Sequence, residues 1–539
     1  MVLNNISEYA SDENWHELKC ILKRLYSDFI VIEIPSDGNV LEPKFNDNIC
    51  SEEVDEEEKE EQGNVDIVTL PKELECLNEQ ISKFSQILEG EINECIVNLK
   101  EFNKDVRKQL YGFIKNNYGS ALMTDCKDGI LTVKKSKGNA SDTRKRKFWP
   151  SARGDYLHFT ITKENMDTNT CIDLIASRLN LKPSLFSVSG SKDRRAITVQ
   201  RVCAYRVNKQ RLCRQHFRHL WLSDFVYSKI KLELGDAYGN HFSIILRDVD
   251  NNFNSEEFNN RIEKWKTNGF LNYFGSQRFG SCGVQTSEIG RLILNQKWEE
   301  AVKALLAPRS DAPERINKCL KHFNDSGNAK QALQLLNDRS AIIERSLLLF
   351  LSKYPNGYKG ALLALPRNSR TMYIHAYQSA VFNHIVSKRK RIFGLKYLPG
   401  DLDIEGKILN DENLNKIENV CLPLPSFENK LPENEVGEWY KEIAKEDGID
   451  YESFKKIERH FGLGNVYRPF IQKPQNVSWQ LLNYSFRDEQ LQNCEFIPKN
   501  EVNEIQKEKI KEENEENIKK AIKLKFNLSS GTYATIGLK

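Results

Sequence analysis

Apolar and polar residues alternate with a period of two in the middle of the chain. Leu157, Phe159 and Ile161 are separated by polar or amphipathic neighbours, and this period is typical of a strand with one buried face. Residues 197–205 and 239–246 have the same strand character. The pattern therefore predicts strands at three separate places.

Between these strands the apolar residues fall three and four positions apart, which is the spacing of an amphipathic helix. One predicted helix carries Ile172, Ile175 and Leu179, and a second is expected to run from a capping Ser255 to a closing Gly269. Strands that alternate with helices in this way indicate an α/β or α+β catalytic half.

The pattern changes after Phe279 and changes back near Trp479. Helical spacing dominates between them, and residues 361–390 are expected to form one helix. The charged run at 500–520 is typical of a solvent-exposed helix, and residues 524–538 have strand character again.

The first part of the chain has a turn that leads into a strand over residues 23–34. Next come an acidic loop and predicted helices, with Leu77, Ile81 and Phe84 at helical spacing. These changes suggest a catalytic domain formed by residues 1–45, 120–275 and 480–539, an acidic and helical insertion at 46–119, and a mainly helical domain at 276–479.

Composition limits the classes of protein that fit. The chain has 539 residues with a hydrophobic fraction of 39%, and no apolar run approaches the roughly 18 residues of a membrane span. Its twelve cysteines include no C-x-x-C pair, and His216 and His219 lack further residues at ligand spacing. We therefore expect a monomeric protein of the nucleus or cytoplasm with no membrane segment, no metal and no disulfide framework.

The charge is divided unevenly. Residues 52–61 hold eight carboxylates and one lysine, so this acidic strip carries −7 and the rest of the chain +10, against +3 for the whole. A basic body is compatible with RNA binding but does not require it. The basic run at 144–147 fits a solvated loop best, and a nuclear import signal or a phosphate contact remains open, because charge alone does not decide among them.

Three motifs combine residue types that carry chemistry. The run from Gly190 to Arg195 (GSKDRR) holds one carboxylate among three cations, which fits either a surface ion-pair cluster or an anionic group beside phosphate-binding cations. The run from Asn272 to Gly280 (NYFGSQRFG) joins aromatic rings to amides and an arginine, and the run from His375 to Asn383 repeats that mixture on a helix. Aromatic faces beside arginine suit an unstacked base.

Together these motifs resemble the signatures of the TruD family of pseudouridine synthases, in its eukaryotic branch. Further matches are Lys23 in the K-x-x-x-x-D-F-x-V-x-E pattern that ends at Glu33, the Gly239–Phe242 block followed by Arg247, and Gly531–Thr535. One departure is Ile536-Gly537, where the family usually has Arg-Glu. The resemblance implies an α+β fold, in which a mainly helical TRUD domain interrupts a catalytic domain with a mixed sheet and flanking helices.

The resemblance also implies a reaction and a site. Uridine in RNA would become pseudouridine without a cofactor, with the D arm of tRNA as the family precedent and small nuclear or messenger RNA as further substrates. Asp193 would be the essential group, acting on C1′ or C6 or as a base, and Lys23 would pair with it and keep it ionised. Phe274 would stack on the flipped base, and Asn272 would bond Asp193 or the uracil edge. The remaining residues implied to bind substrate are Phe29, Glu33, Lys192, Arg194, Gln277 and Arg278.

Two other classes of protein remain open. An RNA-binding protein or RNA chaperone without catalysis would share the basic body and the aromatic residues but would not need Asp193. A helical scaffold that recruits partners through the acidic strip would need none of the three motifs. The intact Gly190–Arg195 block favours the enzyme.

Overall fold

The computed structural model describes most of the chain. The described residues are 8, 18–44, 77–100, 102–118, 121–136, 149, 153–250, 253–280, 284–310, 312–336, 341–409, 416–461, 466–492 and 518–538.

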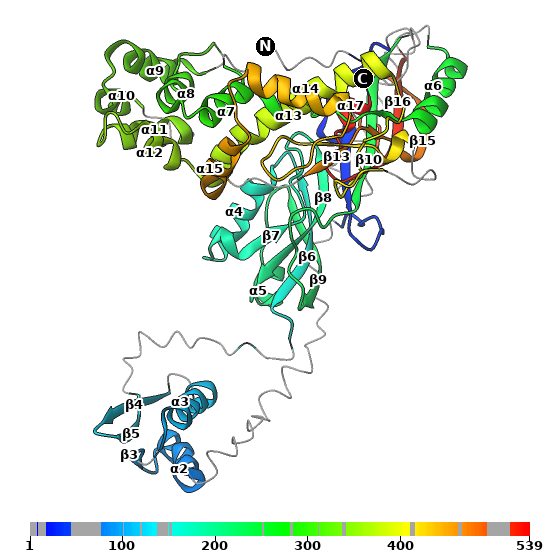
Figure 1. Ribbon diagram of the computed structural model, residues 1–539. Helices are drawn as coiled ribbons and strands as arrows, with labels where there is room; N and C mark the ends of the chain where they lie inside the picture. The colour runs from blue at the N-terminus through cyan, green and yellow to red at the C-terminus, as the bar shows by residue number, and fades with distance from the viewer. Residues whose placement is uncertain are drawn as a thin grey trace.

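A nine-stranded mixed sheet forms the centre of the catalytic domain (Figure 1). β2 and β8 form the parallel pair, and the other described pairs in this sheet are antiparallel. In spatial order the strands are β15 (Gln475–Tyr484), β16 (Lys519–Ser529), β10 (Gly239–Val249), β2 (Phe29–Ile34), β8 (Ile197–Tyr205), β6 (Tyr156–Glu164) and β9 (Leu220–Ser228), while β1 (Ile21–Leu22) pairs with β10 and β7 (Phe186–Val188) with β8. The strands predicted around residues 29, 157, 197 and 239 are therefore confirmed.

β2 lies deep in this sheet, and all six of its residues are buried. Phe29 and Val31 pack into the main core on one face, whereas Ile30 and Ile32 pack against strand β8 on the other. Because both faces are covered, the strand reads as an apolar run and not as an alternation. The exception is Glu33, a buried carboxylate on the face of Phe29.

Helices flank the sheet. α4 (Thr168–Arg178) and α6 (Ser255–Asn268) lie where helices were predicted, and α5 (Lys209–Cys213) and α17 (Ala534–Gly537) are short. The cap of α6 is Asn254 and not Ser255, because the Asn254 side chain accepts the backbone N–H groups of residues 256 and 257. The strand expected over residues 524–538 ends at Ser529, and α17 follows it.

A large helical domain is inserted after β11 (Phe270–Leu271), and Figure 1 shows α8 to α12 gathered at its far end. Its helices are α7 (Thr286–Leu294), α8 (Trp298–Leu305), α9 (Glu314–Ser326), α10 (Ala329–Leu335), α11 (Ile342–Leu351), α12 (Tyr358–Leu363), α13 (Arg367–Phe393), α14 (Glu435–Glu446) and α15 (Glu452–Phe461). The single helix expected at 361–390 is two helices, because Pro366 is the N-cap of α13 and stands between them. α7 packs closely on α13, since a Cβ on Gly290 would lie 2.2 Å from the Tyr373 carbonyl oxygen.

The chain leaves and re-enters the catalytic domain at the same place. β14 (Ile471–Gln472) pairs with β11, and β13 (Tyr467–Pro469) pairs with β12 (Cys421–Pro423). β15 of the main sheet then starts at Gln475. The boundary expected at residue 479 therefore falls inside a strand of the catalytic sheet, and the return lies a few residues earlier.

The insertion near the N-terminus is a small α+β unit (lower left in Figure 1) and not only helical. It contains α2 (Asn78–Glu89), β3 (Glu94–Asn98), α3 (Lys104–Tyr118), β4 (Leu122–Lys127) and β5 (Ile130–Lys135), with strand order β3-β5-β4. Leu131 and Val133 share a core with Ile81, Phe84 and Leu110. The boundary expected at residue 119 is therefore wrong, and the unit extends through β5.

Several predictions fall on residues that lie outside the described ranges. These are the acidic strip at 52–61, the basic run at 144–147 and most of the charged run at 500–520. Among the helices that are described, none combines the length and the apolar character needed to cross a bilayer.

Candidate active site

The turn before β2 is fixed by a buried ion pair. Arg247 of β10 donates from Nε and Nη2 to the two carboxylate oxygens of Asp28, at 2.8 and 2.7 Å. Asp28 also accepts the backbone N–H of Leu25 at 2.8 Å. Such a bidentate pair restricts geometry as well as adding energy. It holds the turn that carries Lys23, whose φ of 57° lies in the left-handed region.

Lys23 reaches the carboxylate that the sequence singled out. Its Nζ lies 2.7 Å from Oδ2 of Asp193, and the two side chains are 15% and 39% exposed. The same Nζ lies 3.9 Å from the centroid of the Phe29 ring. Three residues predicted for the site therefore lie together, with the carboxylate on the solvent side and the ammonium held against an aromatic face.

The loop that carries Asp193 is held from within the sheet. Glu33 is fully buried and accepts hydrogen bonds from Ser189 Oγ at 2.9 Å and from Lys192 Nζ at 2.8 Å. Only 6% of the Lys192 side chain is exposed. Lys192 and Glu33 were expected to bind substrate, but their charged ends bond to each other, and this geometry favours a positioning role.

Two further contacts hold the same loop. Thr168 Oγ1, in the first turn of α4, accepts the backbone N–H of Lys192 at 3.0 Å and donates to Gln200 Oε1 at 2.8 Å. Gln200 Nε2 in turn donates to the Gly190 carbonyl at 3.1 Å. β2, β8 and α4 together therefore set the position of Asp193, because each bonds a residue within four positions of it.

A second cluster forms around Phe274. The backbone N–H and C=O of Phe274 bond the side-chain amide of Asn383, at 2.8 and 3.0 Å. The guanidinium of Arg468 lies 4.1 Å from the ring centroid, and Phe382 meets the ring edge-on at 5.4 Å. Phe274 is 6% exposed. Its ring is thus held rigidly, and only a small part of it is open to a base.

Asn272 is placed differently from the expectation. It is 1% exposed, its Oδ1 accepts from Arg468 Nη2 at 2.6 Å, and its Nδ2 donates to the Pro469 carbonyl at 3.0 Å. Both ends of the amide are therefore engaged with the segment that returns from the helical domain. Of the two partners expected for Asn272, Asp193 is therefore not the one that it bonds in this structure, and a bond to the uracil edge stays a prediction.

The remaining predicted residues lie near the surface. Arg194 and Gln277 are exposed, and Arg278 is half-buried with its guanidinium 5.7 Å from the Phe274 centroid. Arg194 directly follows Asp193, so it is an exposed cation beside the carboxylate. Its place suits a contact with a phosphate.

Arg468 was missed at the sequence level. It joins separate motifs, because it also donates to the Gly531 carbonyl at 2.8 Å and to the Asn272 carbonyl at 2.9 Å. Burial lowers the pKa of Arg468 to about 10. It stands in a segment of ordinary composition, and its partners are far away in the sequence, so no local signal marks it.

Lys163 was also missed, although the sequence carries a signal for it. It continues the buried face of Leu157, Phe159 and Ile161, where the period requires an apolar residue. Its side chain is fully buried, and Nζ donates to the Met166 carbonyl at 2.6 Å.

The surroundings of Lys163 include the catalytic loop. Burial lowers the pKa of Lys163 to about 8, and the charge of Lys192 acts in the same direction. Cys171, Asp167 and Asp193 oppose this shift. Burial also raises the pKa of the Cys171 thiol to about 12. A buried amine thus lies within electrostatic range of Asp193.

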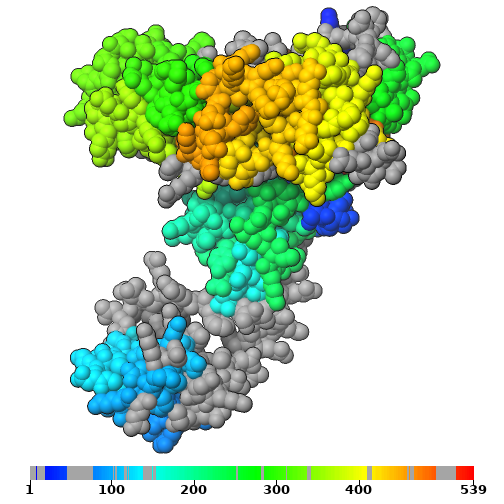
Figure 2. Space-filling model, in the orientation of Figure 1, coloured from blue at the N-terminus to red at the C-terminus, as the bar shows by residue number. Residues whose placement is uncertain are grey.

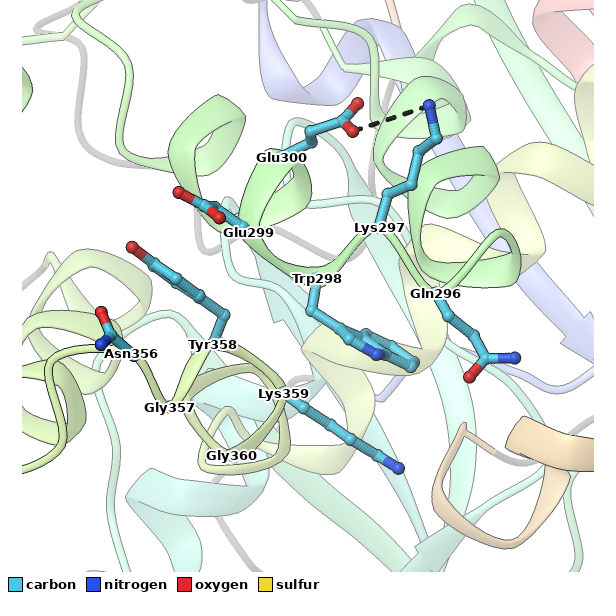
Figure 3. Close-up of a pocket in the computed structure, with 10 residues that line it drawn as sticks. All are labelled: Gln296, Lys297, Trp298, Glu299, Glu300, Asn356, Gly357, Tyr358, Lys359 and Gly360. Atoms are coloured by element: carbon cyan, nitrogen blue, oxygen red, sulfur yellow. Dashed lines mark ion pairs between the residues drawn. The ribbon is translucent and has the colours of Figure 1, made fainter.

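A hollow of about 420 Å³ lies elsewhere, in the helical domain (Figure 3). It is bordered by residues 296–300 and 356–360, and it includes the ring of Trp298 and an ion pair between Lys297 and Glu300 at 3.6 Å. None of the residues of the two clusters lines it. In the described part of the chain, no group of three or more His, Cys, Asp or Glu side chains is arranged to hold a metal ion.

Comparison with known proteins decides the family. The family model described as tRNA pseudouridine synthase D (TruD) matches residues 132–539. The chain belongs to the TruD family. It is therefore a pseudouridine synthase, an isomerase that acts on RNA.

Individual TruD relatives cover nearly all of the chain. The pseudouridylate synthase 7 homolog of Homo sapiens is 34% identical over 537 residues, which cover 96% of this chain and 78% of that protein. The multisubstrate pseudouridine synthase 7 of Schizosaccharomyces pombe is 28% identical and covers 96% of this chain and 87% of its own. A crystal structure from Methanosarcina mazei that was assigned to TruD has the same fold, with a TM-score of 0.50, 24% identity and coverage of 71% and 87% of the two chains.

Proposed function

We propose that this TruD enzyme converts uridine to pseudouridine in the D arm of tRNA and that Asp193 is its essential catalytic group. The observation that carries the proposal is the Lys23–Asp193 ion pair, in which the Asp193 side chain is 39% exposed and the Lys23 side chain only 15%. The pair stands on a turn and a loop that buried contacts hold from both sides. An anionic group fixed at a surface in this way suits attack on a bound nucleoside.

The reaction conserves every atom of the nucleotide. The C1′–N1 bond of uridine breaks, the uracil turns, a C5–C1′ bond forms, and the proton on C5 is lost while N1 gains one. Asp193 serves this sequence by attack on C1′, by attack on C6 or by removal of a ribose proton, and each route needs its negative charge. The target base must leave its stack, at a cost of a few kcal/mol.

Two surface features support handling of the RNA. Arg194 offers an exposed cation next to Asp193, and the guanidinium of the half-buried Arg278 lies 5.7 Å from the centroid of the Phe274 ring. Aromatic contact with a base returns roughly 1–3 kcal/mol. A wider range of RNAs, including small nuclear and messenger RNA, is part of the proposal, because the Schizosaccharomyces pombe relative is named a multisubstrate enzyme.

Asp193→Asn tests the catalytic assignment. Asparagine keeps the size of the side chain and can accept from Lys23, but it cannot act as an anionic nucleophile or base. We expect no pseudouridine by mass spectrometry and an unchanged or slightly tighter tRNA affinity at fixed salt. Activity within about tenfold of wild type, or only ~1.4 kcal/mol of barrier, would assign the chemistry to another residue.

The substrate assignment has its own test. Wild-type enzyme is given tRNA in which each D-arm uridine is replaced in turn by cytidine, together with small nuclear and messenger RNA fragments. Loss of product with one D-arm replacement supports the proposed target. Equal product with every D-arm replacement places the target elsewhere, whatever the outcome for Asp193.

A further inference from the structure

Residues 208–219 form a short basic segment that the active site does not use. They contain Lys209, Arg211, Arg214 and Arg218 with two histidines, and no carboxylate. The three arginines are exposed, and Lys209 is half-buried. The segment has a defined structure. Asn208 caps α5 through a bond to the backbone N–H of residue 210, and the buried Leu212 packs in the core that α4 forms with β6.

The end of α4 extends the same surface. Arg178, in the last turn of α4, lies 5.9 Å from the ring of Phe217. Arg211 Nη2 donates to the Leu179 carbonyl at 2.6 Å, just past the helix. Lys182 follows and is exposed. Figure 1 shows α4 and α5 beside the same group of strands. The α4–α5 basic surface is defined by Arg178, Lys182, Lys209, Arg211, Arg214 and Arg218.

Few carboxylates offset this charge. Glu164 lies 3.0 Å from Nδ1 of His219, which bonds through its other nitrogen to Arg218. Asp173 is the exposed carboxylate on α4 itself. With Asp167 at the N-cap of α4, six cations stand against three carboxylates, which leaves a surface that attracts a polyanion. The contacts of Arg178 and Arg211 hold two of these cations in place, so less side-chain entropy is lost on binding.

The helix α4 connects the loop that carries Asp193 with the far end of this surface. The first residue of α4, Thr168, bonds the backbone of Lys192, and Arg178 stands ten residues further along the helix. Ten residues of α-helix span about 15 Å. A stacked nucleic-acid strand rises ~3.4 Å per nucleotide, so this length corresponds to roughly four to five nucleotides.

We propose that the α4–α5 basic surface binds the phosphate backbone of the RNA stem next to the target uridine, over the four to five nucleotides that the length of α4 spans. This inference rests on the proposed function, since it takes the substrate to be a structured RNA bound at Asp193. The surface strengthens RNA binding and fixes the position of the stem on the protein, and it makes no contact with the reacting base.

A triple variant tests the surface. Lys182→Gln, Arg214→Gln and Arg218→Gln are combined, and Arg211 is left intact because it bonds the backbone. The plot of log affinity for tRNA against log salt should become shallower by roughly two to three units, at 0.7–0.9 per lost phosphate contact. The KM should rise at least about tenfold near physiological salt, with kcat at saturating tRNA unchanged.

A second triple variant is the matched control. Lys318→Gln, Lys321→Gln and Lys330→Gln remove the same charge from exposed positions on α9 and α10 in the helical domain. This control should leave the salt slope near that of wild type. If both triple variants change the salt slope equally, the loss of net charge alone explains the effect. If the first triple variant keeps the wild-type slope, the α4–α5 basic surface does not bind RNA.

The outcomes also separate this inference from the proposed function. Wild-type enzyme that makes no pseudouridine in D-arm tRNA contradicts the proposed function. Wild-type enzyme that makes it while the first triple keeps its KM and its salt slope contradicts the basic surface alone. A fall in kcat at saturating tRNA would show that the surface acts on the catalytic step and not on stem binding.

Discussion

Phe274 is buried in the core and is also predicted to stack on the flipped base. A suitable substitution can separate its part in packing from its part in stacking. Truncation to alanine would cost about 3–5 kcal/mol of stability at so buried a site, so Phe274→Leu is the better change. It keeps apolar volume but removes the aromatic face. We expect a large fall in pseudouridine yield with a small change in tRNA affinity, because phosphate contacts dominate affinity and stacking acts on one base.

Phe382→Leu is the control for this change, since Phe382 is fully buried against the same ring. It should lower the free energy of unfolding without a comparable fall in yield. If both variants lose activity equally, packing of the cluster is what matters and Phe274 has no separate part in binding the base.

Lys163 gives a prediction for stability against pH. Its pKa in the folded protein is about 8, below the ordinary 10.5, so between these values the unfolded chain binds more protons than the folded one. The free energy of unfolding therefore rises with pH over this window on account of Lys163, by up to about 1.4 kcal/mol per pH unit. In Lys163→Met this contribution is absent.

Urea unfolding of both proteins at pH 7, 8, 9 and 10 measures the difference. Wild type should gain stability relative to Lys163→Met as the pH rises above 8, and other titrating groups cancel in the comparison. A difference that stays constant from pH 7 to pH 10 would show that the amine is not forced to give up its proton on folding.

The buried Asp28–Arg247 pair links the turn before β2 to β10. Its contribution to the stability of the fold can be separated from its part in positioning Lys23. Arg247→Met alone leaves an unpaired buried carboxylate and should cost about 3–5 kcal/mol. Adding Asp28→Leu should recover much of that stability. The double variant should nevertheless stay poorly active, because the turn that presents Lys23 to Asp193 has lost its anchor.

The helical domain offers a matched pair for comparison. Arg389 and Asp401 are both fully buried and form a similar bidentate contact. A corresponding double substitution there should change the free energy of unfolding but not the turnover at saturating tRNA. Full activity in the Asp28/Arg247 double variant would show that the pair only stabilises the fold.

At the scale of elements, the sequence predicted the structure where one strong period dominates. The helices α4 and α6 each bury one face. The strands at 156–164 and 197–205 carry long runs of apolar and β-branched residues, and the structure buries most of both strands. β4 and β5 were missed because each is short and lies among polar and charged residues, so that β4 buries only Leu122 and β5 only Leu131 and Val133. The ends of elements depended on single residues, as at Pro366 and Asn254.

The candidate site was predictable only in part, for a physical reason. The sequence identified Asp193 and Lys23 because motifs name residue types, and the structure brings them together. Asn272 and Lys192 were assigned to substrate because their partners, Arg468 and Glu33, lie 196 and 159 positions away. A buried hydrogen bond over such a separation leaves no trace in local spacing.

At the scale of the whole molecule, the acidic strip of residues 52–61 is predicted to be dispensable for the reaction. Its composition cannot form a core, and its charge of −7 repels RNA. Deleting it should leave kcat at saturating tRNA nearly unchanged and lower the KM at low salt. A Gly/Ser replacement of equal length controls for the shortened connection. A loss as large as that of Asp193→Asn would place the strip within the active fold.

The position of β10 has a consequence for biosynthesis. This strand lies between β2 and β16, so its two edges are completed by segments centred near residues 31 and 524. Contacts over such separations form slowly. During translation the β10 edge stays open until β16 has left the ribosome, after the whole helical domain. The nascent enzyme therefore keeps one edge of an apolar strand unpaired while residues 250–529 are synthesised, and an open edge of this kind is prone to aggregation.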